Sequence, residues 1–175
     1  MSNSALKIDP TIYQKMRQVL AANGVLRVGL NMANFLLVSG VDDAGEPDGL
    51  SPDLARQIAT ILDVEPALIP FQGPGELADA IADDAWDLAN IAVEPERAAM
   101  IAFSQSYIHI DANFMTRKGA NMTSNEEVNQ SGVNIILYDR SAYDLWLKDH
   151  YLNANYIRVA TLQESHDRFL AGEGD

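Results

Sequence analysis

The stretch DLANIAVEPERAAMIAFS, residues 87–104, joins an apolar run to a polar turn that carries a single arginine. Its first part, residues 87–93, is short and largely apolar, which is typical of a strand buried on both faces of a parallel sheet. Arg97 follows at the carboxyl end of that strand, where open α/β sheets bind their ligands. The stretch therefore predicts an α/β fold, with Arg97 either as an anion-binding residue or as a surface arginine paired with Glu94 or Glu96.

Upstream of this stretch, strand and helix patterns alternate. Residues 25–30 (VLRVGL) and 67–71 (ALIPF) are predicted strands, and the proline in the second favours an edge position or a strand end. Between them, residues 49–64 predict an amphipathic helix with Ser51 as its N-cap. Residues 73–85 form a loop and a short helix. This βαβαβ order predicts a parallel sheet covered by helices.

Downstream, residues 107–119 are extended over a length that suits a crossing between two lobes better than one strand. Residues 132–138 and 156–160 are predicted strands, and Ser124, Ser141 and Gly172 mark helix ends. The sequence thus predicts two consecutive α/β units. The predicted parts are an N-terminal helical extension (1–22), lobe one (23–106), a hinge strand (107–118) and an incomplete lobe two (119–175).

Composition restricts the possible partners. The chain has 175 residues, with 12 Lys+Arg against 25 Asp+Glu and a formal net charge of −13. No basic cluster is present, so we expect no nucleic-acid partner. No apolar run reaches the roughly 18–20 residues of a membrane helix, so we expect no membrane insertion. With no cysteine, and three histidines without ligand spacing, we expect neither a metal nor another cofactor.

Four blocks occur in a characteristic order: LRVGL, GLSPDLARQIATIL, WDLANIAVEPERAAMIAFSQSYI and VNIILYDRSAYDLWL. Together they resemble the bacterial extracellular solute-binding proteins of family 3, the amino-acid-binding receptors of ABC transporters. The resemblance implies the type II periplasmic-binding-protein fold, in which two α/β lobes are joined by extended hinge strands around a ligand cleft. It also implies that this chain stops before the second crossing between the lobes.

The resemblance assigns a carboxylate-binding role to Arg97, whose planar guanidinium matches a carboxylate with two parallel hydrogen bonds. It also implies a second carboxylate contact at a helix start, at Ser141, Ala142 and Tyr143, where free amides attract anions. Ser141 is equally the expected N-cap, and both roles can hold together.

The remaining candidate ligand-binding residues flank the two strand ends. Asn34 and Phe35 follow the first strand, where family members often place an aromatic residue; the alternatives are a loop asparagine and a core phenylalanine. Three further candidates, Asn90, Ile91 and Ala92, stand where relatives carry small or hydroxyl residues, so backbone groups would have to serve. Glu94 either binds a ligand's ammonium group or is a carboxylate favoured by a helix dipole.

The resemblance implies a non-catalytic protein that captures an amino acid or similar small carboxylate in the interlobe cleft for ABC-type import, with an ABC permease as a partner. An alternative is a dehydratase-like enzyme on the same fold, for which only Glu94 and Asp139 are candidate acids or bases. Another is a cytoplasmic small-molecule sensor. The family implies a periplasmic location, whereas the start of this chain lacks a signal-peptide pattern and leaves a cytoplasmic one open.

Overall fold

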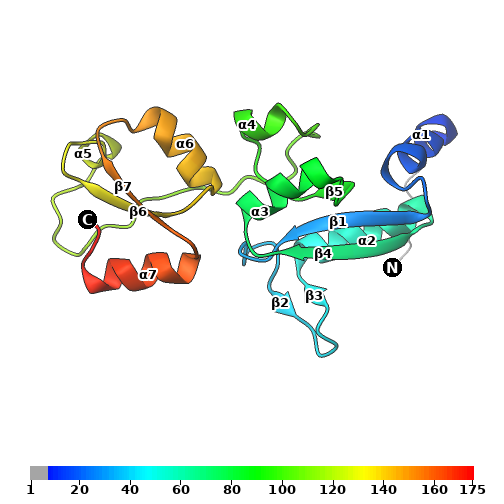
Figure 1. The fold of residues 1–175 in the computed structure, drawn as a ribbon, viewed down its shortest axis with the longest axis horizontal. Helices are drawn as coiled ribbons and strands as arrows, with labels where there is room; N and C mark the ends of the chain where they lie inside the picture. The colour runs from blue at the N-terminus through cyan, green and yellow to red at the C-terminus, as the bar shows by residue number, and fades with distance from the viewer. Residues whose placement is uncertain (1–7) are drawn as a thin grey trace. The chain divides into compact units, whose positions relative to one another are not determined.

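The computed structural model describes residues 8–175, which form two compact units (Figure 1). Unit 1 contains the described residues up to Gln72 together with Asp79–Ile91. Unit 2 contains Gly73–Ala78 and Ala92–Asp175. Both units are built from parallel strands and helices, as the alternating sequence pattern predicts.

The sheet of unit 1 has the strand order β4-β1-β5 and is parallel throughout. In the central strand β1 (Val25–Asn31), Leu26, Val28 and Leu30 are fully buried, because helix α2 (Leu50–Leu62) packs on the strand. Strand β4 (Glu65–Phe71) pairs with β1 over its full length and occupies an edge, which confirms the prediction from its proline. The core residues are Ala21, Leu26, Val28, Leu30, Ala55 and Ala59.

The third strand is shorter than predicted. Strand β5 comprises only Leu88–Ala89, and the chain from Asn90 onward makes no ladder with β1. Before β5, Asp87 makes two hydrogen bonds with the backbone of Arg27: its Oδ2 accepts from the Arg27 N–H at 2.9 Å, and its own N–H donates to the Arg27 carbonyl at 2.9 Å. A side-chain oxygen thus takes the position of a ladder carbonyl.

The predicted N-cap of α2 is wrong. Gly49, with φ of 124°, is the cap, and Ser51 lies buried within the first turn. A Cβ at Gly49 would come within 2.7 Å of the Ser39 nitrogen, so glycine is required both by its backbone conformation and by this close approach. The Ser51 hydroxyl instead accepts a hydrogen bond from Asn90 Nδ2 at 2.9 Å.

Smaller elements complete unit 1. Helix α1 (Pro10–Leu20) is capped by Asp9 and lies within the predicted extension 1–22, whose first seven residues fall outside the described range. Strands β2 (Gly40–Val41) and β3 (Pro47–Asp48) form a short antiparallel hairpin. A 3-10 helix, η1, covers Ala80–Asp83.

Unit 2 is organised around two parallel strands, β6 (Asn134–Tyr138) and β7 (Asn155–Val159). Its core residues are Val128, Ile135, Leu137, Leu147 and Tyr151. The helices of this unit are α4 (Pro95–Ala98), α5 (Asn125–Val128), α6 (Ala142–His150) and α7 (Leu162–Ala171), together with most of α3 (Pro74–Asp79).

The helix ends of unit 2 follow the sequence signals closely. Ser124, a predicted helix end, forms a capping box with Glu127, and Gly172 ends α7 in the left-handed conformation. Ser141 caps α6 by accepting from the Asp144 N–H. The Asp144 carboxylate accepts from the Arg140 N–H, one residue before the position that a capping box requires.

The predicted hinge segment, residues 107–118, contains no strand. None of its residues pairs with a strand in the described sheets. The lobe and hinge boundaries therefore stay a prediction.

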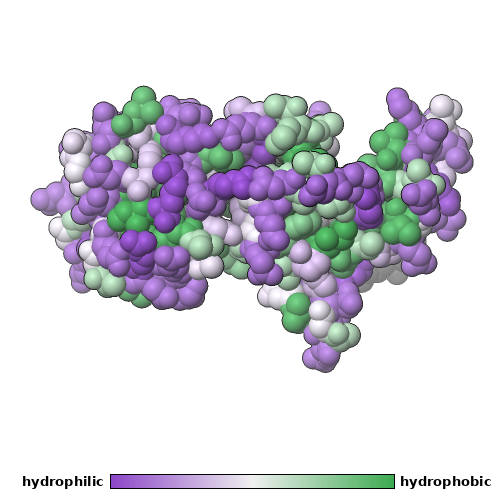
Figure 2. Space-filling model, in the orientation of Figure 1, coloured by the Kyte–Doolittle hydropathy of each residue, from purple (hydrophilic) through white to green (hydrophobic). Residues whose placement is uncertain are grey.

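The surface is predominantly hydrophilic in the view of Figure 2, with apolar side chains in small separate groups. Among residues 8–175, no helix combines the length and the hydropathy that crossing a membrane would require.

Candidate functional site

Arg97 lies in the short helix α4, which begins at Pro95 directly after the extended segment that follows β5. Its residue exposure is only 3%. The guanidinium donates from Nη1 to the Ala92 carbonyl and from Nη2 to the Arg140 carbonyl, each at 3.2 Å. All three residues belong to unit 2.

The positive charge of Arg97 has no direct counter-ion among residues 8–175, because no carboxylate lies within 4 Å of its guanidinium. Burial lowers the pKa of Arg97; the charge of Glu94 opposes this effect, and that of Arg140 adds to it. Arg97 is therefore not a surface arginine paired with Glu96, because Glu96 forms its ion pair with Lys148.

Glu94 is the residue before α4 and is 8% exposed. Its carboxylate does not cap the helix, and it makes no hydrogen bond or ion pair with any described residue. Burial raises the pKa of Glu94, while the nearby charge of Arg97 acts in the opposite direction. Glu94 and Arg97, three residues apart on one helical turn, are thus two buried opposite charges, and neither has a charged partner in direct contact.

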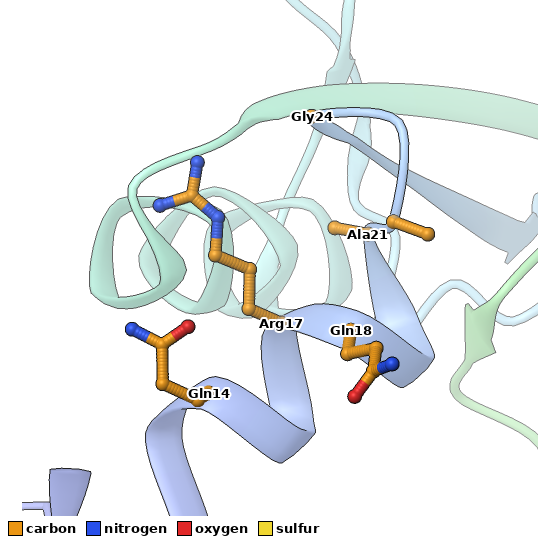
Figure 3. Close-up of a pocket in the computed structure, with 6 residues that line it drawn as sticks. Gln14, Arg17, Gln18, Ala21 and Gly24 are labelled. Carbon is orange, nitrogen blue, oxygen red and sulfur yellow. The ribbon is translucent and has the colours of Figure 1, made fainter. Parts of the chain in front are cut away.

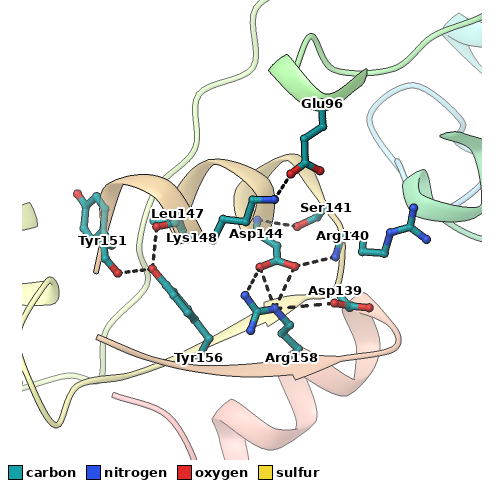
Figure 4. A network of polar contacts seen from close by, with 10 residues as sticks. All are labelled: Glu96, Asp139, Arg140, Ser141, Asp144, Leu147, Lys148, Tyr151, Tyr156 and Arg158. Atoms are coloured by element: carbon teal, nitrogen blue, oxygen red, sulfur yellow. Dashed lines mark hydrogen bonds and ion pairs between the residues drawn. The ribbon is translucent and has the colours of Figure 1, made fainter. Parts of the chain in front are cut away.

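The start of α6 adjoins Arg97 through the carbonyl of Arg140. Arg140 has a positive φ of 55°, which turns the chain from β6 into the helix. Asp144 holds this turn by accepting from the Arg140 N–H at 2.9 Å and by an ion pair of 2.8 Å with Arg158 (Figure 4). The cap at Ser141 leaves the amides of Ala142 and Tyr143 without intrahelical acceptors.

Two further contacts fix α4 and α3 within unit 2. Lys148 of α6 forms an ion pair with Glu96 of α4 (Figure 4). At the start of α3, a Cβ on Gly73 would lie 1.8 Å from the Tyr138 hydroxyl, and one on Gly75 would lie 3.2 Å from Arg140 Cβ. The β6–α6 turn is therefore closely packed from two sides.

The ten predicted ligand-binding residues divide between the two units. Asn34, Phe35, Asn90 and Ile91 belong to unit 1. The other six, Ala92, Glu94, Arg97, Ser141, Ala142 and Tyr143, belong to unit 2, where contacts link α4 to the start of α6.

In unit 1, Phe35 is 69% exposed, so the alternative of a core phenylalanine is wrong. Asn34 behaves as a loop asparagine in one respect, because its Oδ1 accepts from the Leu36 N–H at 3.3 Å. The Asn90 amide donates to Ser51, which satisfies part of its hydrogen-bonding capacity. A ligand-binding role for these residues stays a prediction.

Sequence reasoning missed Gly73, Gly75 and Lys148. From the sequence, the two glycines are predicted only as part of a loop. Glycines on both sides of Pro74 at a helix start do, however, indicate a place where another part of the chain comes close to the backbone. Nothing in the sequence pairs Lys148 with Glu96, which lies 52 residues earlier.

A separate open pocket in unit 1 is lined by Gln14, Arg17, Gln18, Ala21, Ala22 and Gly24 (Figure 3). It contains none of the predicted site residues, and Arg17 already lies 3.6 Å from the carboxylate of Asp63. No group of three or more histidine, aspartate or glutamate side chains within residues 8–175 is arranged to hold a metal ion.

Comparison with known families gives the class of protein. A model of the bacterial extracellular solute-binding proteins, family 3, matches residues 26–169. The chain belongs to this family, which confirms the resemblance carried by its sequence blocks. A comparison with curated proteins finds no match.

Several solved structures share the fold. An ancestral amino-acid-binding protein, a precursor of cyclohexadienyl dehydratase, is 20% identical with a TM-score of 0.71 over 94% of this chain and 71% of its own. The cysteine-binding protein from Campylobacter jejuni is 20% identical, with a TM-score of 0.66 over 94% of this chain and 65% of its own. Arginine-bound, truncated ArgBP from T. maritima is 21% identical, with a TM-score of 0.65 over 93% of this chain and 74% of its own. These matches confirm the α/β, type II periplasmic-binding-protein fold.

Proposed function

We propose that this protein captures an amino acid or similar small carboxylate and delivers it to an ABC-type importer, without changing it chemically. The observation that carries the proposal is the buried guanidinium of Arg97, which lacks a carboxylate partner in the described chain. Family membership and the amino-acid-binding proteins among the structural neighbours support it. Because members of this family are extracellular, we propose a location outside the cytoplasm.

The physical argument concerns the cost of burying charge. An unpaired charge in a protein interior costs several kcal/mol, which two hydrogen bonds to neutral carbonyls offset only in part. A guanidinium has five N–H donors, and Arg97 uses two of its nitrogens on the Ala92 and Arg140 carbonyls. A ligand carboxylate would supply the missing negative charge and accept from the remaining donors. The free amides at the start of α6 would favour the same anion.

The first prediction is that Arg97→Gln weakens amino-acid binding about 30-fold or more, because loss of one partner of a buried charge pair costs about 2 kcal/mol or more. Isothermal titration calorimetry with the twenty amino acids, followed by the tightest binder against the variant, measures this. Arg17→Gln removes the same charge from the unit 1 pocket and serves as the control. Equal affinities for Arg97→Gln and Arg17→Gln would overturn the role of Arg97.

A dehydratase-like activity is the second candidate. It is favoured by two observations: a structural neighbour is a precursor of cyclohexadienyl dehydratase, and burial raises the pKa of Glu94 toward the range of a general acid. Incubation of the protein with its tightest amino acid and then with cyclohexadienyl acids, followed by mass spectrometry, distinguishes the two functions. Recovery of unchanged compounds is expected for a binding protein, and time-dependent loss of water would support the enzyme.

A further inference from the structure

Arg97 is tied to the start of α6 by a single hydrogen bond. Of its two acceptors, the Ala92 carbonyl lies only five residues earlier in the same segment. The other acceptor is the Arg140 carbonyl, 43 residues later, which accepts from Nη2 at 3.2 Å. Because a guanidinium is planar and rigid, fixing both of its Nη groups also fixes the direction of its remaining donors. The orientation of Arg97 toward α6 therefore depends on the peptide group of Arg140.

Arg140 presents that carbonyl from an unusual backbone conformation. Its φ is 55°, and between residues 8 and 175 the other non-glycine residues with positive φ are Asp63 and Asp84. An aspartate tolerates this left-handed region better than an arginine does, because its short polar side chain can hydrogen-bond to the nearby backbone. The left-handed turn at Arg140 therefore needs support from another residue.

Asp144 supplies this support. Its Oδ2 accepts from the Arg140 N–H at 2.9 Å. Arg158 of β7 holds the carboxylate in turn, with Nε at 3.0 and 3.1 Å from its two oxygens and Nη2 at 2.8 Å from Oδ1 (Figure 4). Contacts to both oxygens fix a carboxylate more closely than a single contact does. The peptide group of Arg140 is thus held at its N–H by Asp144, while its carbonyl accepts from Arg97.

Helix α7 has a similar cap without a link to Arg97. Glu164, like Asp144 the third residue of its helix, accepts at 3.0 Å from the N–H of Ala160, the residue before the cap Thr161. The Glu164 side chain is 42% exposed, whereas that of Asp144 is 6% exposed. Ala160 does not have a positive φ. Capping a helix in this way therefore requires neither the burial of Asp144 nor the left-handed turn at Arg140.

We propose that Asp144, held by Arg158, is a positioning residue for Arg97. It fixes the peptide group of Arg140, whose carbonyl orients the Arg97 guanidinium to receive a ligand carboxylate. The proposal rests on the proposed function for the identity of that carboxylate, but the orientation of Arg97 can be measured without a ligand.

Two readouts test the proposal in the full chain. NMR of protein labelled with isotopic arginine follows the Nη signals of Arg97, which are identified by their absence in Arg97→Gln. Calorimetry at pH 7 follows the affinity for the tightest binder among the twenty amino acids. Asp144→Ala should lose the slowly exchanging Nη signals, because the acceptor of Nη2 is no longer fixed. It should also weaken binding about tenfold or more, the usual effect of removing a group that orients a binding residue.

Two variants separate positioning from helix capping and from charge. Asp144→Asn keeps an oxygen that can accept from the Arg140 N–H, so it should recover the Nη signals and most of the affinity that Asp144→Ala loses. Glu164→Ala removes the corresponding carboxylate of α7 and should leave both readouts as in wild type. If Asp144→Ala does not fold, Asp144→Ser replaces it, because serine also removes the carboxylate and is well suited to the first turn of a helix.

The outcomes separate this proposal from the function on which it rests. If Arg97→Gln weakens binding but Asp144→Ala leaves the Nη signals and the affinity unchanged, the role of Asp144 is overturned and that of Arg97 stands. Equal losses in Glu164→Ala would overturn it as an effect of capping, and equal losses in Asp144→Asn would overturn it as an effect of charge. If no amino acid binds to wild type, the proposed function fails, and the Nη signals alone decide whether Asp144 positions Arg97.

Discussion

At the scale of single residues, Glu94 and Arg97 are two charges whose burial opposes folding. Each charge is desolvated by burial, which raises the pKa of Glu94 and lowers that of Arg97. Neither is compensated by an ion pair, although the protein has exposed carboxylates in excess. Natural binding sites commonly keep such unfavourable groups because the ligand, not the fold, satisfies them.

This arrangement predicts a pH-dependent gain in stability on removing the Glu94 charge. Because the pKa of Glu94 is raised in the folded state, its ionised form destabilises the fold above that pKa, and the effect disappears as pH falls below the ordinary glutamate range. Glu94→Gln should therefore raise the free energy of unfolding by about 1 kcal/mol at pH 7 and by much less at pH 4. Thermal denaturation of the ligand-free protein at both pH values measures this.

The matched control is Glu96→Gln, which removes a paired and exposed carboxylate and should not stabilise the protein at either pH. A loss of stability in Glu94→Gln at pH 7 would mean that the Glu94 charge is compensated within the chain, contrary to the site described above.

The sequence predicts an anion-binding role for Arg97, because an arginine after a strand can lie at the ligand-binding edge of a parallel sheet, and this role stays a prediction. The burial of Arg97 and its lack of a counter-ion could not be predicted from the sequence. Both depend on contacts with Arg140, 43 residues later, and on the pairing of Glu96 with Lys148. Sequence spacing alone would equally allow Glu96 to form an ion pair with Arg97.

At the scale of secondary-structure elements, the start of α3 packs directly on the end of β6. Gly73 is the point of closest approach, since a Cβ there would lie 1.8 Å from the Tyr138 hydroxyl and 2.9 Å from its Cζ. Gly75 leaves more room, with its nearest neighbour at 3.2 Å. The two glycines therefore differ in how much the chain depends on them.

Gly73→Ala should lower the free energy of unfolding by about 1–3 kcal/mol, the usual cost of overpacking, because the tyrosine ring must move. Gly75→Ala should cost less. Urea denaturation of both variants measures the difference. The double variant Gly73→Ala, Tyr138→Phe should recover part of the loss, since it removes the nearest atom and leaves the ring. Equal effects of the two glycine substitutions would contradict this packing.

Elements with strong periodicity were predictable and elements defined by distant partners were not. The apolar runs of β1 and β6 and the cap signals at Ser124, Ser141 and Gly172 were confirmed. The predicted N-cap of α2, Ser51, was wrong because Gly49 lies close to the backbone of Ser39. This tertiary contact outweighs the local preference for a serine cap. The predicted hinge segment, residues 107–118, forms no strand, because a strand needs a partner that its own sequence does not specify.

At the scale of the whole molecule, the net charge of −13 is the dominant electrostatic property. Like charges repel across a compact chain and destabilise it relative to the expanded unfolded state. Salt shortens the range of this repulsion, because the Debye length falls from about 30 Å at 0.01 M to about 10 Å at 0.1 M. The fold should therefore be more stable at moderate ionic strength than at very low ionic strength.

The last prediction is that the melting temperature of the ligand-free protein rises when sodium chloride is increased from about 10 mM to about 100 mM, the range over which the Debye length falls threefold. A variant with Asp43→Lys and Glu46→Lys, both exposed in the β2–β3 turn, provides the control. Each replacement removes one negative charge and adds one positive charge, so the net charge changes from −13 to −9. Differential scanning fluorimetry should show a smaller salt-induced rise for this variant than for wild type. An identical rise in both would assign the salt effect to local ion binding, for which the buried cation Arg97 would be the first candidate, and not to repulsion spread over the chain.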